Sequence, residues 1–369
     1  MLKAAIDATQ NNELTHARVP YALRRVPLEK MVCMLPLVEK PVAGTIGLAE
    51  VERVGKNSTV ELADGRRAAL HAGDRLLVVF GNRYATSQFE GYAEVKGDRC
   101  DLLSMGGICG RVRSKHVAVS DPTTLRLVAM VGDNHGEILR LHDFSAASSG
   151  NGRPGLRVIV VCGTSMDSGK TFAATSVIRG LAKRGERVAG IKLTGTGCGR
   201  DTWGMADAGG RPALDMVDGG MASTFQASIP QLLQLHQLLS AVAREQGAEW
   251  AVVEIADGLL QKETAELIHS EEFTKSVDAW ILSAGDALGA MASIQLLREG
   301  GIRPAAITGL VSMSPLGIRE TEEATAIRCL TAAQVQDEFV MEEMARRVQL
   351  KLNDHENHVD KLPRAMAAS

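Results

Sequence analysis

A glycine-rich segment from Gly163 to Thr171 carries the residue types that a phosphate-binding loop requires. It reads Gly-Thr-Ser-Met-Asp-Ser-Gly-Lys-Thr and follows an apolar run typical of a buried strand. Glycines let the backbone approach phosphate groups, while consecutive N–H groups and the start of a helix supply partial positive charge. In such a loop Lys170 reaches the β- and γ-phosphates, and the Thr171 hydroxyl is a ligand for Mg²⁺. The segment therefore predicts binding of a nucleoside triphosphate together with Mg²⁺.

We expect the nucleotide to contact the whole loop and the residue after it. The predicted contact residues are Gly163, Thr164, Ser165, Met166, Asp167, Ser168, Gly169, Lys170, Thr171 and Phe172.

Two further polar residues, Lys192 and Glu254, each close an apolar run that is typical of a strand. Ligands of open α/β sheets gather at such strand ends. We expect Lys192 to act with Lys170 in neutralising a transferring phosphoryl group. Glu254 is expected to face a ligand there, with a buried or capping carboxylate as the alternative. Asp167, inside the loop, is either a third catalytic residue or an acid that only stiffens the loop.

The stretch Thr194–Gly220 is rich in glycine and poor in aliphatic residues. It is predicted to be a loop that orders around the second substrate or the γ-phosphate, with a long surface connection as the alternative. Asp201 is its first candidate site residue, although any of four acids is open to that role or could only cap the loop: Asp201, Asp207, Asp215 and Asp218. Cys198 is a candidate accessible thiol. Two acids further along are candidates for supporting the site: Asp257 and Asp286.

The elements that position these residues alternate along residues 156–352. The predicted strands are Arg157–Cys162, Val188–Leu193, Trp250–Ile255, Ala279–Ser283 and Ala305–Val311. The predicted helices are Thr171–Arg184, Gln231–Glu245, Ala290–Arg298 and a stretch from about Arg319 to Leu350. Strands that alternate with helices predict a mostly parallel sheet covered on both faces, which is an α/β fold.

The first 145 residues follow a different pattern and predict a small β-rich domain, either a barrel or a sandwich. Short apolar runs separated by turn residues predict strands at Met31–Leu35, Thr45–Val54, Ser58–Leu62 and Leu76–Phe80. A Gly- and Ser-rich flexible linker is expected at 146–155. Residues 353–369 are expected to be a mobile tail.

The bulk composition limits the classes of protein that need to be considered. The 369 residues suit two domains, and 45% hydrophobic with 23% charged residues is an ordinary globular mixture. A net charge of −3 argues against a general nucleic-acid binder. Six scattered cysteines without a CxxC pair argue against a zinc site and fit a reducing compartment. With no apolar stretch typical of a signal peptide or a membrane span, the expected location is cytoplasmic.

The phosphate loop resembles that of dethiobiotin synthetases. Five residues separate Gly163 from Gly169, and an acid, Asp167, stands two positions before the second glycine. Lys192 resembles the lysine that ends that family's second strand and faces substrate and phosphates. Glu254 resembles the Mg²⁺-associated glutamate that ends its third strand. The resemblance implies a two-fold homodimer that completes the site.

A second resemblance lies in Gly-Arg-Asp-Thr-Trp at Gly199–Trp203, followed by Ala208 and Gly209. It is similar to the GTP-binding protein of molybdenum-cofactor nucleotide attachment, in which the aspartate lies at the metal and phosphates. This resemblance implies that Asp201 is a metal ligand, with Asp207, Asp215 and Asp218 as alternatives. Together the two resemblances place residues 156–315 in the P-loop group that also contains cobyrinic-acid amide synthetases and MinD-type ATPases. Residues 1–150 resemble no family that we can name.

The departures from dethiobiotin synthetases leave the second substrate open. Leu193 stands where that family has a proline, and Ile255–Gly258 replaces its Gly-Ala-Gly-Gly run. The expected function is a Mg-ATP-dependent synthetase that phosphorylates a carboxylate or carbamate for attack by a nucleophile. The alternative is an accessory or switch NTPase in cofactor or metal-centre maturation. The fifth strand end lacks the guanine-reading Asn-Lys-x-Asp motif, so ATP is expected, with GTP as the alternative.

Overall fold

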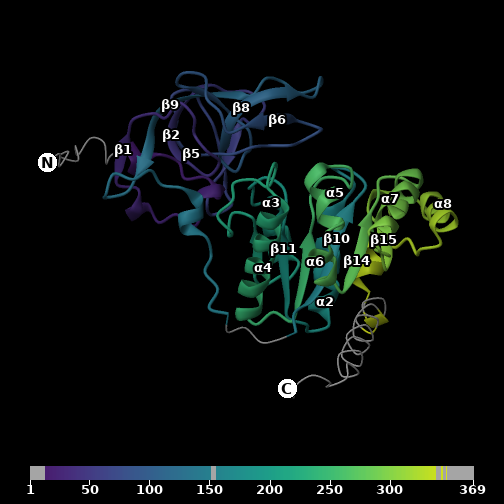
Figure 1. The fold of residues 1–369 in the computed structure, drawn as a ribbon. Coiled ribbons are helices and arrows are strands. Elements are labelled where there is room, and N and C mark those ends of the chain that lie inside the picture. Colours follow the sequence, from purple (N-terminus) through teal and green to yellow (C-terminus); the bar gives the residue numbers. More distant parts are fainter. Residues whose placement is uncertain (1–12, 151–154, 338–341, 344–345, 347–369) are drawn as a thin grey trace, which may run out of the picture.

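The computed structural model describes residues 13–150, 155–337, 342–343 and 346. Figure 1 shows two parts: a β-rich part in purple and blue, and an α/β part in teal, green and yellow. The predicted mobile tail at 353–369 lies outside the described residues. Within the described ranges, no helix combines the length and the apolar character needed to cross a membrane.

The β-rich part is built from short strands. They are β1 (Cys33–Leu35), β2 (Ile46–Arg53), β3 (Thr59–Glu61), β4 (Arg67–Ala69), β5 (Arg75–Phe80), β6 (Phe89–Tyr92), β7 (Arg99–Leu102), β8 (Ile108–Lys115) and β9 (Thr123–Gly132). Strands β2, β5, β8, β7 and β9 pair in that order, and β9 pairs back with β2, so the circuit is closed. Alternate residues of a strand face opposite sides. The side chains on one side of all five strands pack together in a buried cluster that includes Val51, Val78, Leu102, Cys109 and Leu125.

We call this part the barrel. Short 3₁₀ helices accompany it: η1 (Tyr21–Leu23), η2 (Leu28–Lys30) and η3 (Leu141–Phe144). Tyr21 and Leu23 of η1 are buried.

The α/β part contains a six-stranded sheet in the order β12-β11-β13-β10-β14-β15, and every pair in it is parallel. Its strands are β10 (Arg157–Gly163), β11 (Val188–Lys192), β12 (Ala213–Asp215), β13 (Trp250–Glu254), β14 (Ala279–Ser283) and β15 (Ala306–Thr308). Parallel strands bring their carboxyl ends to one edge of the sheet, where α/β proteins bind ligands. The mixed α/β fold with a parallel sheet agrees with the expectation from sequence.

Helices cover both faces of this sheet. They are α2 (Lys170–Lys183), α3 (Arg200–Asp207), α4 (Ile229–Glu245), α5 (Lys262–Ile268), α6 (Glu271–Lys275), α7 (Ala287–Glu299), α8 (Pro315–Thr325) and α9 (Ala332–Gln336), with η4 (Leu310–Met313) before α8. Val158 and Val160 of β10 pack into the cluster that includes α4 and α7. The intervening Ile159 and Val161 pack into the cluster of α2 on the other face. This alternation explains why β10 reads as a continuous apolar run.

Three expectations from the sequence need correction. Thr194–Gly220 is not one long loop, because it contains α3 and β12, and Met205 and Met216 are fully buried. The last strand ends at Thr308 rather than Val311, because Gly309 takes a left-handed φ of 97° and starts η4. The predicted terminal helix is interrupted at Ala326, whose left-handed φ of 55° ends α8. A left-handed residue cannot continue a right-handed helix.

The first residues of the predicted flexible linker contact the α/β part. Ala146 is buried, and its N–H donates to the carbonyl of Asp218 over 2.6 Å. The Ser148 hydroxyl donates to Oε1 of Glu245, at the end of α4, over 2.7 Å. Residues 151–154 lie outside the described chain.

Candidate functional site

The phosphate loop joins β10 directly to α2, as its sequence predicts. The side chain of Lys170 folds back over the loop, and Nζ donates to the carbonyl of Ser165 over 2.7 Å. A Cβ on Gly163 would come within 2.7 Å of Cγ of Lys170, so only glycine leaves room for this path. Gly169 has a φ of 101°, and a Cβ there would lie 3.2 Å from the backbone of Gly309. The two glycines are therefore required by the course of the loop itself.

Neighbouring strand ends hold the loop from outside. The carbonyl of Ser168 accepts from the Ser283 hydroxyl at 2.9 Å and from the N–H of Leu310 at 3.1 Å. The N–H of Thr164 donates to the carbonyl of Ser283 over 3.0 Å. Sequence reasoning missed Ser283 and Leu310 as supports, because contacts between segments that are distant in the chain leave no residue pattern. These bonds fix the loop on β14 and on the turn after β15.

The remaining loop residues differ in exposure. Asp167 is exposed and has a left-handed φ of 63°. Phe172 is 62% exposed, and the sulfur of Met166 lies 3.4 Å from the Ser87 hydroxyl of the barrel. The Ser168 hydroxyl is buried and has no hydrogen-bond partner within the described residues. A buried, unpartnered hydroxyl is available to a ligand that enters the loop.

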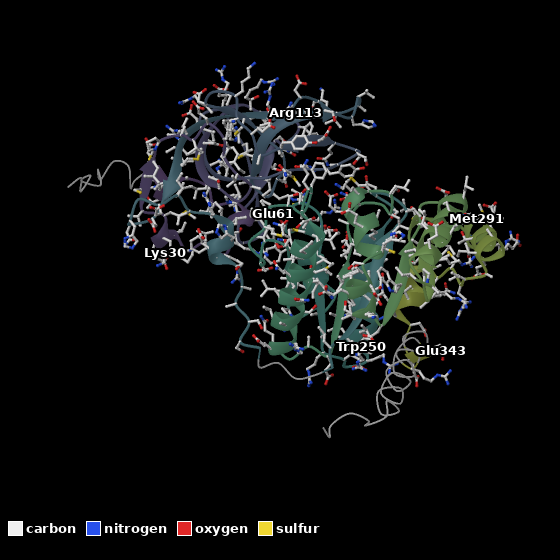
Figure 2. All side chains as sticks on the ribbon, viewed as in Figure 1. Lys30, Glu61, Arg113, Trp250, Met291 and Glu343 are labelled. Atoms are coloured by element: carbon white, nitrogen blue, oxygen red, sulfur yellow. The ribbon has the colours of Figure 1, made fainter. Side chains whose placement is uncertain are left out.

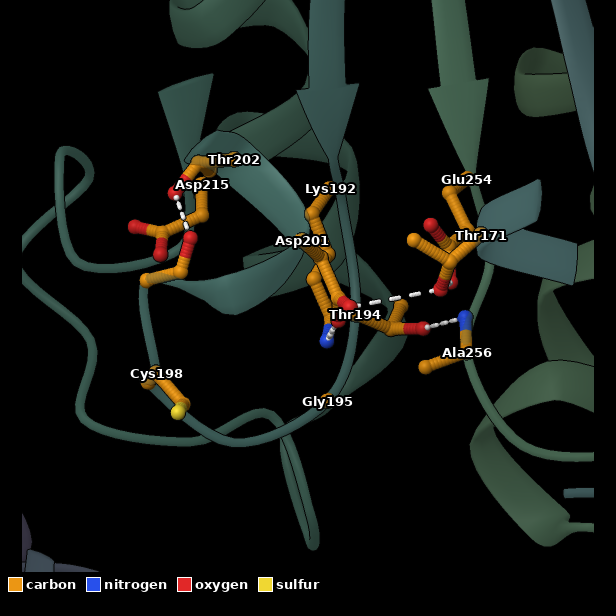
Figure 3. A network of polar contacts seen from close by, with 12 residues as sticks. Thr171, Lys192, Thr194, Gly195, Cys198, Asp201, Thr202, Asp215, Glu254 and Ala256 are labelled. Atoms are coloured by element: carbon orange, nitrogen blue, oxygen red, sulfur yellow. Dashed lines mark hydrogen bonds and ion pairs between the residues drawn. The ribbon is translucent and has the colours of Figure 1, made fainter. Parts of the chain in front are cut away.

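Thr171 and two carboxylates meet at the start of α2 (Figure 3). The Thr171 hydroxyl lies 3.0 Å from Oε1 of Glu254 and 3.3 Å from Oδ1 of Asp201. Lys192 and Glu254 are register partners on β11 and β13, so both end at the same level of the sheet. Oε2 of Glu254 is buried without a hydrogen-bond partner among the described residues. Three residues predicted for the metal are thus adjacent.

These donors suit Mg²⁺. Mg²⁺ prefers oxygen ligands and is usually held by one or two carboxylates together with substrate phosphates and water. Thr171, Glu254 and Asp201 supply that kind of oxygen, and the unpartnered Oε2 of Glu254 lacks a cation or donor. No group of three or more His, Cys, Asp and Glu side chains within the described ranges makes a complete metal cage. The residues therefore fit a metal that is held jointly with phosphates.

Lys192 forms an ion pair with Oδ2 of Asp201 (Figure 3). Burial alone would lower the pKa of Lys192, but the adjacent carboxylates of Asp201 and Glu254 outweigh it and raise the pKa. Burial would raise the pKa of Asp201, but the charge of Lys192 and its hydrogen bond lower it. Both groups are therefore charged at neutral pH. Gly195 lies against Lys192: a Cβ there would meet Cε at 3.1 Å.

Two other titratable groups at these strand ends are perturbed. Burial, helped by the charge of Asp201, raises the pKa of Glu254 to about 7. Burial also raises the pKa of Asp257 to about 6, against the charges of Lys170 and Lys192. Burial lowers the pKa of Lys170, and Lys192 contributes to this in a minor way. Such shifts are frequent where charges gather for binding or catalysis.

The geometry separates Asp201 from the other candidate acids. Asp215 and Asp218 pair instead with Arg24 of the barrel, over 2.8 and 2.6 Å. Asp207 is exposed at the end of α3. Asp286 caps α7, where Oδ1 accepts from the N–H of Gly289 over 2.7 Å. Among these acids, Asp201 is the one that contacts Thr171 and Lys192.

The barrel holds the helix that carries Asp201. Figure 2 shows Glu61 where the barrel meets the α/β part. The buried Glu61 carboxylate accepts from the N–H of Gly199 at 2.8 Å and from Nε1 of Trp203 at 3.0 Å. It also accepts from the Cys198 thiol at 3.1 Å.

Tyr21 adds a second connection from the barrel. Its hydroxyl lies 2.7 Å from Oγ1 of Thr202 on α3 and 2.9 Å from Oδ2 of Asp215 on β12. The contacts of Glu61 and Tyr21 with the α/β part all span more than 130 positions of the chain, which is why the sequence did not reveal them.

Cys198, the candidate accessible thiol, is partly buried, and its thiol donates to Glu61. Burial and the neighbouring Glu61 carboxylate raise the pKa of Cys198 to about 12. A nucleophilic cysteine requires the opposite shift. Cys162 is buried in β10, as expected for a core residue.

Comparisons with known proteins give only distant likeness. No protein-family model matches the chain, and no curated protein matches it. One similar solved structure is a DUF1611 family protein from Anabaena variabilis, with a TM-score of 0.37 and 13% identity over 55% of this chain. Another is the 54 kDa protein of the signal recognition particle from Aeropyrum pernix in complex with GDP, with a TM-score of 0.33 and 18% identity over 53% of this chain. The matches span 61% and 50% of those two chains, which is less than two thirds of either.

Proposed function

We propose that this protein is a Mg-ATP-dependent synthetase. The observation that carries this proposal is the convergence of Lys170, Lys192 and Glu254 on one edge of the sheet, beside the phosphate loop. One lysine suffices to hold the phosphates of a bound nucleotide. Lys192, a second lysine at the end of β11, can stabilise the negative charge that builds when a phosphoryl group moves between two oxyanions.

In the proposed reaction a carboxylate or carbamate oxygen takes the γ-phosphoryl group of ATP. A new P–O bond forms as the bond to ADP breaks. A nucleophile then attacks the activated carbon, and phosphate leaves with the electrons of the C–O bond. Thr171, Glu254 and Asp201 would hold Mg²⁺, which neutralises phosphate charge when it is bound.

The proposal is tested by product analysis on the purified protein. A synthetase releases ADP only when its acceptor is present. Positional isotope exchange in ATP that depends on the acceptor, but not on the final nucleophile, supports an activated intermediate. ADP release at the same rate with and without every acceptor offered would count against the synthetase.

A second candidate is a nucleotide-dependent accessory protein or switch. The contacts of Glu61 with Gly199 and Trp203 favour it, because they connect the barrel to the helix that carries Asp201. A partner that binds the barrel would then alter the nucleotide site. Slow hydrolysis that changes when a partner protein is added, with ATP or with GTP, would identify this class.

We also propose a cytoplasmic location, following the scattered cysteines without a CxxC pair, and a homodimer, following the resemblance of the α/β part to dethiobiotin synthetases. Two-fold dimers are the commonest homo-oligomers. Light scattering that gives the mass of one chain, in a fully active sample, would remove this part of the proposal.

A further inference from the structure

Asp257 lies in the turn after β13, three positions beyond Glu254. Its backbone has a left-handed φ of 63°. Residues other than glycine rarely adopt this conformation, and those that do cluster at functional sites. The side chain is partly buried, and its carboxylate accepts no hydrogen bond from the residues that the structure describes. The turn therefore presents a carboxylate with free acceptor oxygens.

The turn that carries Asp257 packs directly against the phosphate loop. A Cβ on Gly258 would lie 2.7 Å from the carbonyl oxygen of Thr164 and 2.8 Å from Cα of Ser165. Only glycine allows this close approach. The Ser165 carbonyl also accepts from Nζ of Lys170. Asp257 is thus placed beside the part of the loop where the Lys170 side chain ends.

The charges around Asp257 keep it ionised. Burial raises the pKa of Asp257 to about 6, and the charges of Lys170 and Lys192 oppose that rise. Glu263 and Arg83 contribute smaller effects, which are opposite in sign to each other. Asp257 is therefore mostly a carboxylate at neutral pH and is able to take up a proton. A proton acceptor works best when its pKa lies near the working pH.

The open space beside Asp257 admits water and excludes a larger nucleophile. A pocket between Asp257, Tyr84 of the barrel and the loops after β11 and β13 has a free volume of about 10 Å³. That volume is room for a single water molecule, and such a molecule needs polar partners. The hydroxyls of Thr194 and Thr196 line the pocket together with the Asp257 carboxylate and supply them. A nucleophile that reaches Asp257 from this side is therefore water.

This water-sized pocket adjoins the phosphate site. Gly195 lines the pocket, and a Cβ on it would meet Cε of Lys192 at 3.1 Å. The N–H of Ala256 donates to the Thr194 hydroxyl over 2.8 Å, which joins the turns after β11 and β13 (Figure 3). Asp257 therefore borders both the pocket and the two lysines that would hold the transferring phosphoryl group.

We propose that this site also hydrolyses ATP with water, and that Asp257 is the general base of this reaction. The water oxygen forms a bond to the γ-phosphorus as the bond from that phosphorus to ADP breaks, with its electrons going to ADP. One proton of the water passes to Oδ of Asp257, which is partly exposed and returns it to solvent. The inference rests on the Mg-ATP binding of the proposed function, but not on an acceptor. Acceptor-dependent ADP release, which tests the synthetase, is measured above this slow basal rate.

The test measures phosphate release by the purified full chain with Mg-ATP alone, under single-turnover conditions. Asp257→Asn keeps the size of the side chain and tolerates the left-handed φ of 63°, but an amide cannot take up the proton. Its hydrolysis rate should fall by about 100-fold or more, the size of a general-base contribution. Its affinity for Mg-ATP should stay within a few-fold of the parent chain. Glu266→Gln removes an exposed acid of α5 and should hydrolyse ATP like the parent.

A second variant, Asp257→Gly, separates proton transfer from a structural role. Glycine suits the left-handed φ and leaves space for a small carboxylate. Added sodium formate should restore part of the hydrolysis of Asp257→Gly, whereas the same concentration of sodium chloride should not. Three results would overturn this role for Asp257. They are parent-like hydrolysis by Asp257→Asn, no effect of formate on a slow Asp257→Gly, and no hydrolysis by the parent above the rate in buffer.

A separate titration with Mg-ATP distinguishes failure of this inference from failure of the proposed function. If an acceptor stimulates ADP release but the Asp257 variants hydrolyse ATP like the parent, the inference fails and the synthetase stands. If hydrolysis depends on Asp257 but no acceptor stimulates ADP release, Asp257 stands as the base and the synthetase fails. If the parent chain does not bind Mg-ATP, both fail.

Discussion

The hydroxyl oxygen of Thr171 lies 3.0 Å from Oε1 of Glu254, although 83 positions separate the two residues in the chain. Thr171 belongs to the first turn of α2, and Glu254 ends β13. The parallel pairing of β10 with β13 brings them together, since Val161 and Glu254 are register partners. One oxygen of Glu254 is then occupied by the hydroxyl, while the other is buried and unpartnered.

Glu254→Gln should weaken Mg²⁺-dependent ATP binding and turnover together. A neutral amide is a poorer partner for the metal or for its water ligands, whereas its oxygen can still accept from Thr171. We expect an affinity loss of about tenfold in the presence of Mg²⁺ and a much smaller loss in EDTA. Calorimetric titration of ATP with and without Mg²⁺ measures the difference. An equal loss under both conditions would show that Glu254 acts without the metal.

Lys170→Ala should abolish useful nucleotide binding. The loss of a charge-assisted contact to phosphate costs at least ~1.5–3 kcal/mol, or roughly 10- to 100-fold in affinity. Lys183→Ala is the matched control, because Lys183 is exposed at the far end of the same helix. Fluorescence titration with a labelled ATP analogue compares the two variants. Parent-like affinity of Lys170→Ala would overturn the phosphate-loop assignment.

Lys192→Ala should lower kcat by ~100-fold or more and leave ATP affinity within a few-fold. If Lys192 stabilises charge that builds only during transfer, its removal affects the transition state more than bound ATP. Because Asp201 loses its ion-pair partner in this variant, thermal unfolding should be recorded alongside the kinetics. Intact turnover in a stable variant would favour the accessory NTPase over the synthetase.

Glu61→Gln should destabilise the contact between the barrel and α3. One carboxylate oxygen accepts from Cys198 and Gly199 and the other from Trp203, and an amide can replace only one of these oxygens. A buried donor without a partner costs about 1–3 kcal/mol. We expect a lower Tm and weaker Mg-ATP binding, while Glu52→Gln, a partly exposed acid of the same barrel, should change neither. Loss of Tm alone would mean that the contact is structural only.

His236 on α4 should make the protein less stable in mild acid. Burial lowers the pKa of His236 to about 4, while an unfolded histidine titrates near 6.5. Between these values the unfolded chain binds the proton and the folded chain does not. The free energy of unfolding is therefore unaffected by this histidine above pH 6.5. It falls as the pH drops towards 4, by up to ~3 kcal/mol. Urea unfolding at several pH values should show a smaller acid loss for His236→Gln.

The sequence by itself determined the phosphate loop and the strands and helices next to it. Gly163, Gly169, Lys170 and Thr171 are close in the chain, and their chemistry depends on local geometry: a tight loop, a helix start and a buried strand. The strand-end positions of Lys192 and Glu254 were also predictable from sequence, because a polar residue that ends an apolar strand is a local pattern.

Only the tertiary structure shows which contacts each of the four acids after Gly195 makes. These acids are Asp201, Asp207, Asp215 and Asp218. Asp201 contacts Thr171 and Lys192, whereas Asp215 and Asp218 pair with Arg24 of the barrel. Helix α3 was not predicted from the sequence for a similar reason. Its short polar sequence contacts Glu61 and Tyr21 of the barrel. A small pocket likewise joins Tyr84 of the barrel to Asp257 of the α/β part. Contacts between distant segments follow no periodicity along the chain, so only packing of the barrel against the α/β part reveals them.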